Sequence, residues 1–86
     1  MKLENKTRKV RIVTGDAGMF ALGGTGVNSK GEFQRGVVDI PLDKIPSLAA
    51  DLAHLAHANA IGLTADAPEE DRALWSDLLA SNPKQV

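Results

Sequence analysis

Residues 37–48 read VVDIPLDKIPSL, and the spacing of their apolar side chains changes halfway along. Up to Ile40 the alternation is that of a strand, with Val38 and Ile40 on one face. Pro41 ends the strand because it has no amide hydrogen for a sheet ladder, and we expect Asp43 to cap the helix that follows. This stretch therefore predicts a strand that leads directly into a helix.

Residues 43–60 have the pattern of one amphipathic helix. Pro46 falls in its first turn, where proline is tolerated. The larger apolar residues are three or four positions apart and define a stripe that should lie on a sheet, made of Ile45, Leu48, Leu52 and Leu55. Alanines fill much of the remaining surface, which favours helix and lets another element approach closely. Gly62 is expected to end the helix, with Leu63 folding back behind it.

The residues before this stretch predict further strands. Residues 6–14 alternate between two faces, one with Val10, Ile12 and Thr14 and the other with Lys9, Arg11 and Val13. A Gly/Asp turn at 15–18 leads to a second strand at 19–22, and a turn at 28–31 leads to a third at 32–40. Residues 23–27 add a fourth short strand if they pair separately. Consecutive strands with short turns predict an antiparallel meander.

A second helix is expected at residues 67–80. Asp66 and Glu69 have the spacing of a capping box, and Asn82-Pro83 ends the segment. Its apolar stripe should pack on the first helix or over the sheet edge, with Leu74, Trp75, Leu78 and Leu79 as its members. The sequence thus predicts one α+β domain over residues 1–86, a three- or four-stranded antiparallel meander followed by two C-terminal helices packed on one face. Residues 1–5 and 83–86 are expected to be flexible.

The composition limits the possible functions. The chain has 86 residues and no cysteine, which excludes disulfides and thiolate zinc sites and favours a reducing, cytoplasmic setting. No stretch resembles a signal peptide or approaches the length of a membrane span. The net charge of −1 combines two unlike halves, because residues 1–40 carry seven Lys/Arg against four acids and residues 41–86 carry three against seven. Such asymmetry favours a protein that works by contact.

Motifs for catalysis or cofactor binding are lacking. The glycines at 15–26 run from strand to strand rather than into a helix, and no serine lies in a nucleophile elbow. His54 and His57 project away from the leucine stripe, so we expect solvent or a partner around them rather than a metal ion. We therefore expect a non-enzymatic protein with no metal and no small-molecule cofactor, and we treat His54 and His57 as secondary interface candidates.

The sheet face directed away from the first helix is the predicted interaction surface. Alternation places cations and apolar residues on it, namely Lys9, Arg11, Val13, Phe33, Arg35 and Val37. An apolar strip ringed by cationic stems suits a protein interface, either in a homodimer or with a larger protein. Cations with an aromatic ring also suit single-stranded nucleic acid, although three aromatic residues in the whole chain allow little stacking. A small interaction or regulatory protein is the preferred interpretation, and a nucleic-acid-binding accessory protein is the alternative.

Overall fold

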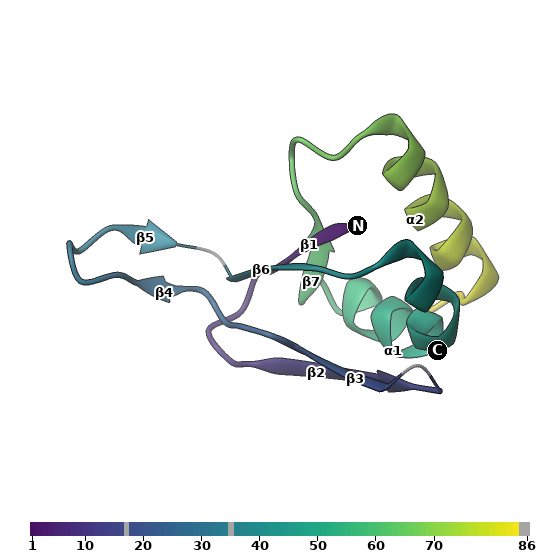
Figure 1. Cartoon of the computed structure of the whole chain (residues 1–86), viewed down its shortest axis with the longest axis horizontal. Helices are drawn as coiled ribbons and strands as arrows, with labels where there is room; N and C mark the ends of the chain where they lie inside the picture. The colour runs from purple at the N-terminus through teal and green to yellow at the C-terminus, as the bar shows by residue number, and fades with distance from the viewer. Residues whose placement is uncertain (17, 35, 85–86) are drawn as a thin grey trace.

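The structure is a computed structural model that describes residues 1–16, 18–34 and 36–84 (Figure 1). Its strands are β1 Lys2–Asn5, β2 Arg11–Gly15, β3 Gly18–Leu22, β4 Gly26–Val27, β5 Phe33–Gln34, β6 Gly36–Asp39 and β7 Ile61–Leu63. A 3-10 turn at Leu42–Lys44 precedes helix α1, Ile45–His57, and helix α2 spans Glu69–Ser81. The predicted α+β class, with a three-stranded antiparallel sheet and two C-terminal helices, is confirmed.

The three-stranded sheet joins strands that are distant in the sequence, in the order β6-β1-β7, rather than the consecutive strands of the predicted meander. Leu3 pairs with Val38 on one side and with Leu63 on the other, so β1 is the central strand. The expectation that residues 1–5 are flexible is therefore wrong. Leu3 and Asn5 are fully buried, and this burial comes from pairing with segments more than 30 residues away, which no local pattern reveals.

Strands β2 and β3 form a hairpin that packs against α1. Val13 pairs with Phe20, and Val13 and Leu22 are buried in the core. The predicted orientation of this strand is wrong, because Ile12 is exposed and Val13 is in the core. Gly15 explains the inversion: it lies on the Val13 face, and a Cβ there would overlap the Ser47 carbonyl, so this face is the one that contacts α1.

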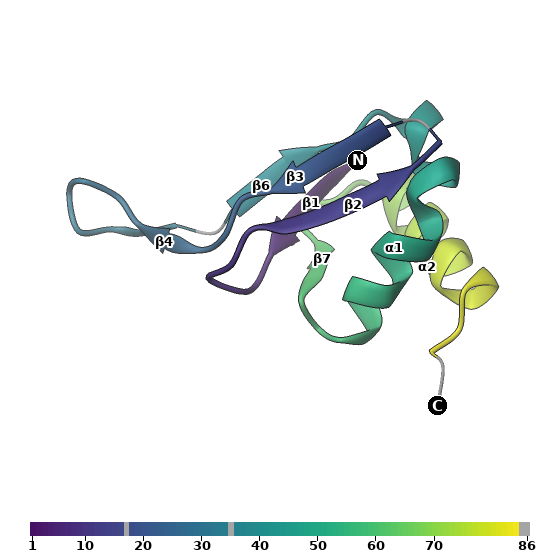
Figure 2. The same cartoon turned by 90° about the horizontal axis from the view of Figure 1, so that it is seen from below.

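Strands β4 and β5 form a second hairpin, which projects from the rest of the molecule. Gly26 pairs with Gln34 and Val27 with Phe33. In both views this segment extends beyond the sheet and helices, along the longest, 40 Å axis (Figures 1 and 2). We call residues 26–34 the arm.

Helix α1 joins the hairpin β2–β3 to the three-stranded sheet, since it contacts both β2 and β7. Ile45, Leu48 and Leu52 are buried, as predicted, and Pro46 lies in the first turn. Asp43 does not cap α1, because Lys44 holds the N-cap position and no side chain caps the helix.

The end of α1 also differs from the prediction. Asn59 adopts φ 60° and takes the place of the expected glycine, with amide bonds from Asn59 to the Ala56 carbonyl and from Ala60 to the Leu55 carbonyl. This is a Schellman ending, in which asparagine tolerates the left-handed conformation. Gly62 then lies in β7 rather than at a helix end, because pairing with Glu4 extends the chain there.

Helix α2 packs on α1, and its Trp75 and Leu78 are buried. The predicted capping box is not formed, since Pro68 is the N-cap and no side-chain cap bond is made. Three acids in the first turn still complement the helix dipole. Leu74 was expected in the stripe but is 44% exposed. No helix in the described part of the chain is long and apolar enough to cross a membrane.

Candidate interaction surface

The five described residues of the predicted surface do not lie together on one face of the molecule. Val13 is 0% exposed and belongs to the core. Lys9 is exposed in the β1–β2 loop, and Arg11 is half-buried with its Nε donating to the Thr7 hydroxyl at 3.3 Å. Val37 is exposed on β6, whereas Phe33 lies on the arm; Arg35 lies outside the described residues. The predicted residues therefore do not form one surface, and only the exposed ones among them are candidates for binding a partner.

The arm carries the most exposed aromatic side chain among the described residues. Phe33 is 64% exposed and its cross-strand partner Val27 is 65% exposed, so the pair presents apolar surface that the rest of the chain does not cover. The nine arm residues contain one cation, Lys30, and one acid, Glu32, so the arm has no net charge. An uncharged, projecting apolar pair is typical of a contact with another protein.

The tip of the arm is held in shape by one side chain. The Asn28 carboxamide oxygen accepts hydrogen bonds from the Lys30 and Glu32 amides, both at 2.9 Å. Backbone bonds from Asn28 to the Glu32 carbonyl and from Gly31 to the Asn28 carbonyl close the turn, and Gly31 has φ 80°. The tip thus has a defined conformation without support from the body.

The root of the arm is anchored to the β1–β2 loop. Thr25 donates its amide to the Thr7 carbonyl at 2.7 Å and its hydroxyl to the Asn5 carbonyl at 2.8 Å. Glycines permit close backbone contacts here, because a Cβ on Gly24 would overlap the Arg8 carbonyl and a Cβ on Gly36 would overlap the Gly23 carbonyl. The root therefore fixes where the arm leaves the body.

The β1–β2 loop, residues 6–10, presents three exposed cations, Lys6, Arg8 and Lys9. None of them forms an ion pair with the described part of the chain. We call residues 6–10 the basic loop. It lies beside the root of the arm, so cations and the apolar arm belong to the same end of the molecule (Figure 1).

Buried Asn5 organises the basic loop. Its carboxamide nitrogen donates to the carbonyls of Lys9 at 2.8 Å and Leu22 at 3.0 Å, and its oxygen accepts from the amide and hydroxyl of Thr7 at 2.9 and 2.7 Å. Sequence reasoning missed this role, because the only local signal is Asn5 two residues before Thr7, a spacing that also occurs in simple Asx turns.

The outward face of the hairpin β2–β3 is a further apolar surface that the sequence did not predict. Ile12 pairs with Ala21, and Thr14 pairs with Met19, so these four residues share the face opposite Val13. Ile12, Met19 and the preceding Val10 are all more than half exposed. The alternation of residues 6–14 placed Val10, Ile12 and Thr14 together on one face, but the interaction surface was predicted on the opposite face.

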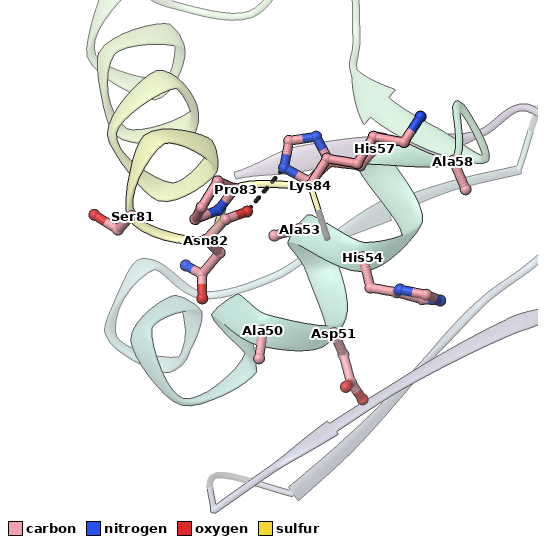
Figure 3. Close-up of a pocket in the computed structure, with 10 residues that line it drawn as sticks. All are labelled: Ala50, Asp51, Ala53, His54, His57, Ala58, Ser81, Asn82, Pro83 and Lys84. Atoms are coloured by element: carbon pink, nitrogen blue, oxygen red, sulfur yellow. Dashed lines mark hydrogen bonds between the residues drawn. The ribbon is translucent and has the colours of Figure 1, made fainter. Parts of the chain in front are cut away.

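The two histidines line an open groove of about 860 Å³ between α1 and the end of α2 (Figure 3). The Nε2 atom of His57 lies 2.8 Å from the Asn82 carbonyl oxygen, so this nitrogen carries the proton and donates it. His54 is exposed and points away from that contact, while the Asp51 carboxylate accepts from the amide and hydroxyl of Thr14. His57 thus has a structural contact, and His54 is the more available of the two.

The described ranges 1–16, 18–34 and 36–84 contain no group of three or more His, Cys, Asp or Glu side chains placed to hold a metal ion.

Comparison with known proteins found no matching family model, no matching curated protein and no matching solved structure.

Proposed function

We propose that this chain is a small, non-enzymatic interaction protein that binds another protein through its arm. The observation that carries the proposal is the Val27–Phe33 pair, which lies on a projecting hairpin and is about two-thirds exposed on both strands. Isolated two-stranded hairpins are marginal in water. Apolar side chains on such a segment do little for the chain's own core, and they are the residues a partner can bury.

The free energy gained by burying apolar surface favours a partner with an apolar pocket. Each Å² of apolar surface removed from water stabilises a complex by about 25 cal/mol before the costs of association. Aromatic side chains in central pockets contribute a large share of binding energy at interfaces, and Phe33 is the aromatic residue placed to do so. The bonded tip and the anchored root reduce the conformational entropy lost on binding.

Nucleic acid binding remains a second candidate because of the basic loop. Lys6, Arg8 and Lys9 are exposed, form no ion pair with the described residues and are held on an ordered backbone, an arrangement that can follow phosphates. Stacking is the weak part of this candidate. Trp75 is buried, and Phe20 is half-buried with the Lys44 ammonium 5.7 Å from its ring centre, which leaves Phe33 as the free ring. We therefore favour a protein partner, and we place its action in the cytoplasm on the basis of the cysteine-free composition.

The test compares Phe33→Ser with the matched control Leu42→Ser, whose side chain is also about half exposed but lies outside the arm. Tagged wild-type protein should capture a protein from the lysate of its own host at low and high salt. Phe33→Ser should lose the captured protein and Leu42→Ser should keep it. Equal capture by all three chains would contradict the proposal.

Nucleic acid binding is tested on the same preparations. A labelled single-stranded oligonucleotide would be titrated with wild type and with the Lys6→Glu/Arg8→Glu/Lys9→Glu variant, and followed by fluorescence anisotropy. The second candidate requires binding that weakens steeply with salt and disappears in the variant. Binding with these properties, together with capture that does not depend on Phe33, would replace the first proposal by the second.

A further inference from the structure

The exposed surface of α2 is complementary in character to the arm end of the molecule. Leu74 is 44% exposed, and helical spacing surrounds it with Glu70, Asp71 and Asp77 at positions i−4, i−3 and i+3. Glu70 and Asp77 are exposed and form no ion pair with the described residues. This face of α2 therefore offers an apolar centre with an acidic rim, and we call it the α2 face.

The arm end of the molecule, which comprises the arm and the basic loop, combines an apolar centre with positive rather than negative charges. Its apolar centre is the Val27–Phe33 pair, and the nearby cations of the basic loop have no acidic partner within the described chain. The arm and α2 lie at opposite ends of the 40 Å axis in both views, so one molecule cannot bring its own two surfaces together (Figures 1 and 2).

We infer that the partner of the arm is the α2 face of a second copy of this chain, an inference that rests on the proposed function and names its partner. Three observations favour a second copy: both surfaces have an exposed apolar centre, the charges around the two centres are opposite, and neither set of charges forms an ion pair with the described residues of its own chain. Charge complementarity at the rim selects the partner and its orientation, while the apolar centre supplies affinity.

The geometry of such a contact is heterologous, because two different surfaces meet. Each molecule keeps one free arm and one free α2 face after a first contact, so association continues until a ring closes or an open filament grows. The complex of two chains is then an intermediate rather than the end point. This separates the inference from a two-fold symmetric homodimer.

The experiment uses two variants that each remove one surface. Val27→Ser/Phe33→Ser removes the apolar centre of the arm, and Glu70→Lys/Leu74→Ser removes the α2 face; all four side chains are exposed, so folding should persist, which circular dichroism checks. Mass is measured by size-exclusion chromatography with light scattering over a range of concentrations up to about 1 mM, so that contacts with a Kd up to about that value are detected.

Wild type should exceed the mass of two chains as concentration rises, and each variant alone should remain a single chain. An equimolar mixture of the two variants should give complexes of two chains and nothing larger, because only one functional contact can form. Association in the wild type should also weaken with salt. The variant Ile12→Ser, on the outward face of the hairpin β2–β3, is the control and should behave as wild type.

Three results would overturn the inference. They are a wild type that stays a single chain throughout, a mixture in which no two-chain complex forms, and loss of association in Ile12→Ser rather than in the α2 variant. A single-chain wild type that still captures another protein through Phe33 would reject self-association and leave the proposed function standing. Failure of both experiments would reject both.

Discussion

The two hairpins of this chain have the same local construction, but one is covered by a helix and the other is exposed. In β2–β3, one face lies under α1, and Val13 and Leu22 are fully buried. In the arm, neither Val27 nor Phe33 is covered, although the pair lies directly across the ladder as Val13 and Phe20 do. The difference shows that an apolar cross-strand pair contributes to the core only where another element covers it, and is otherwise available for binding.

The largest expected loss of stability comes from a substitution in the hairpin β2–β3, which α1 covers. Leu22→Ala should lower the free energy of unfolding by about 2–5 kcal/mol, because it removes a buried side chain and leaves a cavity in the core. Urea unfolding measures the change. Val27→Ala in the arm is the matched control and should change stability by less than about 0.5 kcal/mol. Similar losses for the two variants would mean that the arm is part of the core.

A second pair of substitutions compares the two asparagines that organise loops. Asn5→Ala should cost about 1–3 kcal/mol, because the buried carbonyl of Leu22 loses its donor and water cannot easily replace it. Asn28→Ala removes similar bonds at the exposed tip of the arm, where solvent can compensate. Thermal unfolding should therefore show a larger loss of stability for Asn5→Ala than for Asn28→Ala. A larger loss of stability for Asn28→Ala would contradict this prediction.

A smaller effect is expected where α1 holds the hairpin from outside the core. The Asp51 carboxylate accepts two bonds from Thr14, at 2.9 and 3.0 Å, in an exposed position. Asp51→Ala should cost about 0.5–1.5 kcal/mol. The same measurement on Asp77→Ala, an exposed acid on α2, provides the reference and should show no loss. Equal changes in the free energy of unfolding for Asp51→Ala and Asp77→Ala would show that the Asp51 hydrogen bonds do not stabilise the packing of β2–β3 on α1.

The smallest effect on stability is expected for the residue most important to the proposed function. Phe33→Ser should change the free energy of unfolding by less than about 0.5 kcal/mol, because the side chain is mainly in solvent. Association measured by light scattering should nevertheless weaken by about tenfold or more. A loss of stability without a loss of association would show that Phe33 supports the fold instead.

Much of the helical half could be predicted because its signals are local. The stripe of Ile45, Leu48 and Leu52 located α1 to within a few residues, and Trp75 and Leu78 were correctly assigned to a buried face of α2. The caps were less predictable. Asp43 and Asp66 are good capping residues, yet the helices begin after Lys44 and Pro68 without side-chain caps.

The candidate surface could be predicted only in part. Phe33 and Val37 were recognised as exposed, and Lys9 as an exposed cation, but Val13 was assigned to the wrong face. Residues 6–14 carry apolar side chains on both faces, so the alternation alone does not determine which face is covered. The contact between Gly15 and Ser47 of α1 determines it, and that contact joins segments more than 30 residues apart.

The sequence by itself determined the class of the fold, the positions of its helices and the charge difference between its halves, because periodicity, proline and charge act over a few neighbouring residues. The tertiary structure alone decided that β1 is central, which face of β2–β3 is buried, and that Val27 and Phe33 project on an arm. Each of these depends on pairing or coverage by distant segments, which is a property of the assembled chain and not of any local stretch.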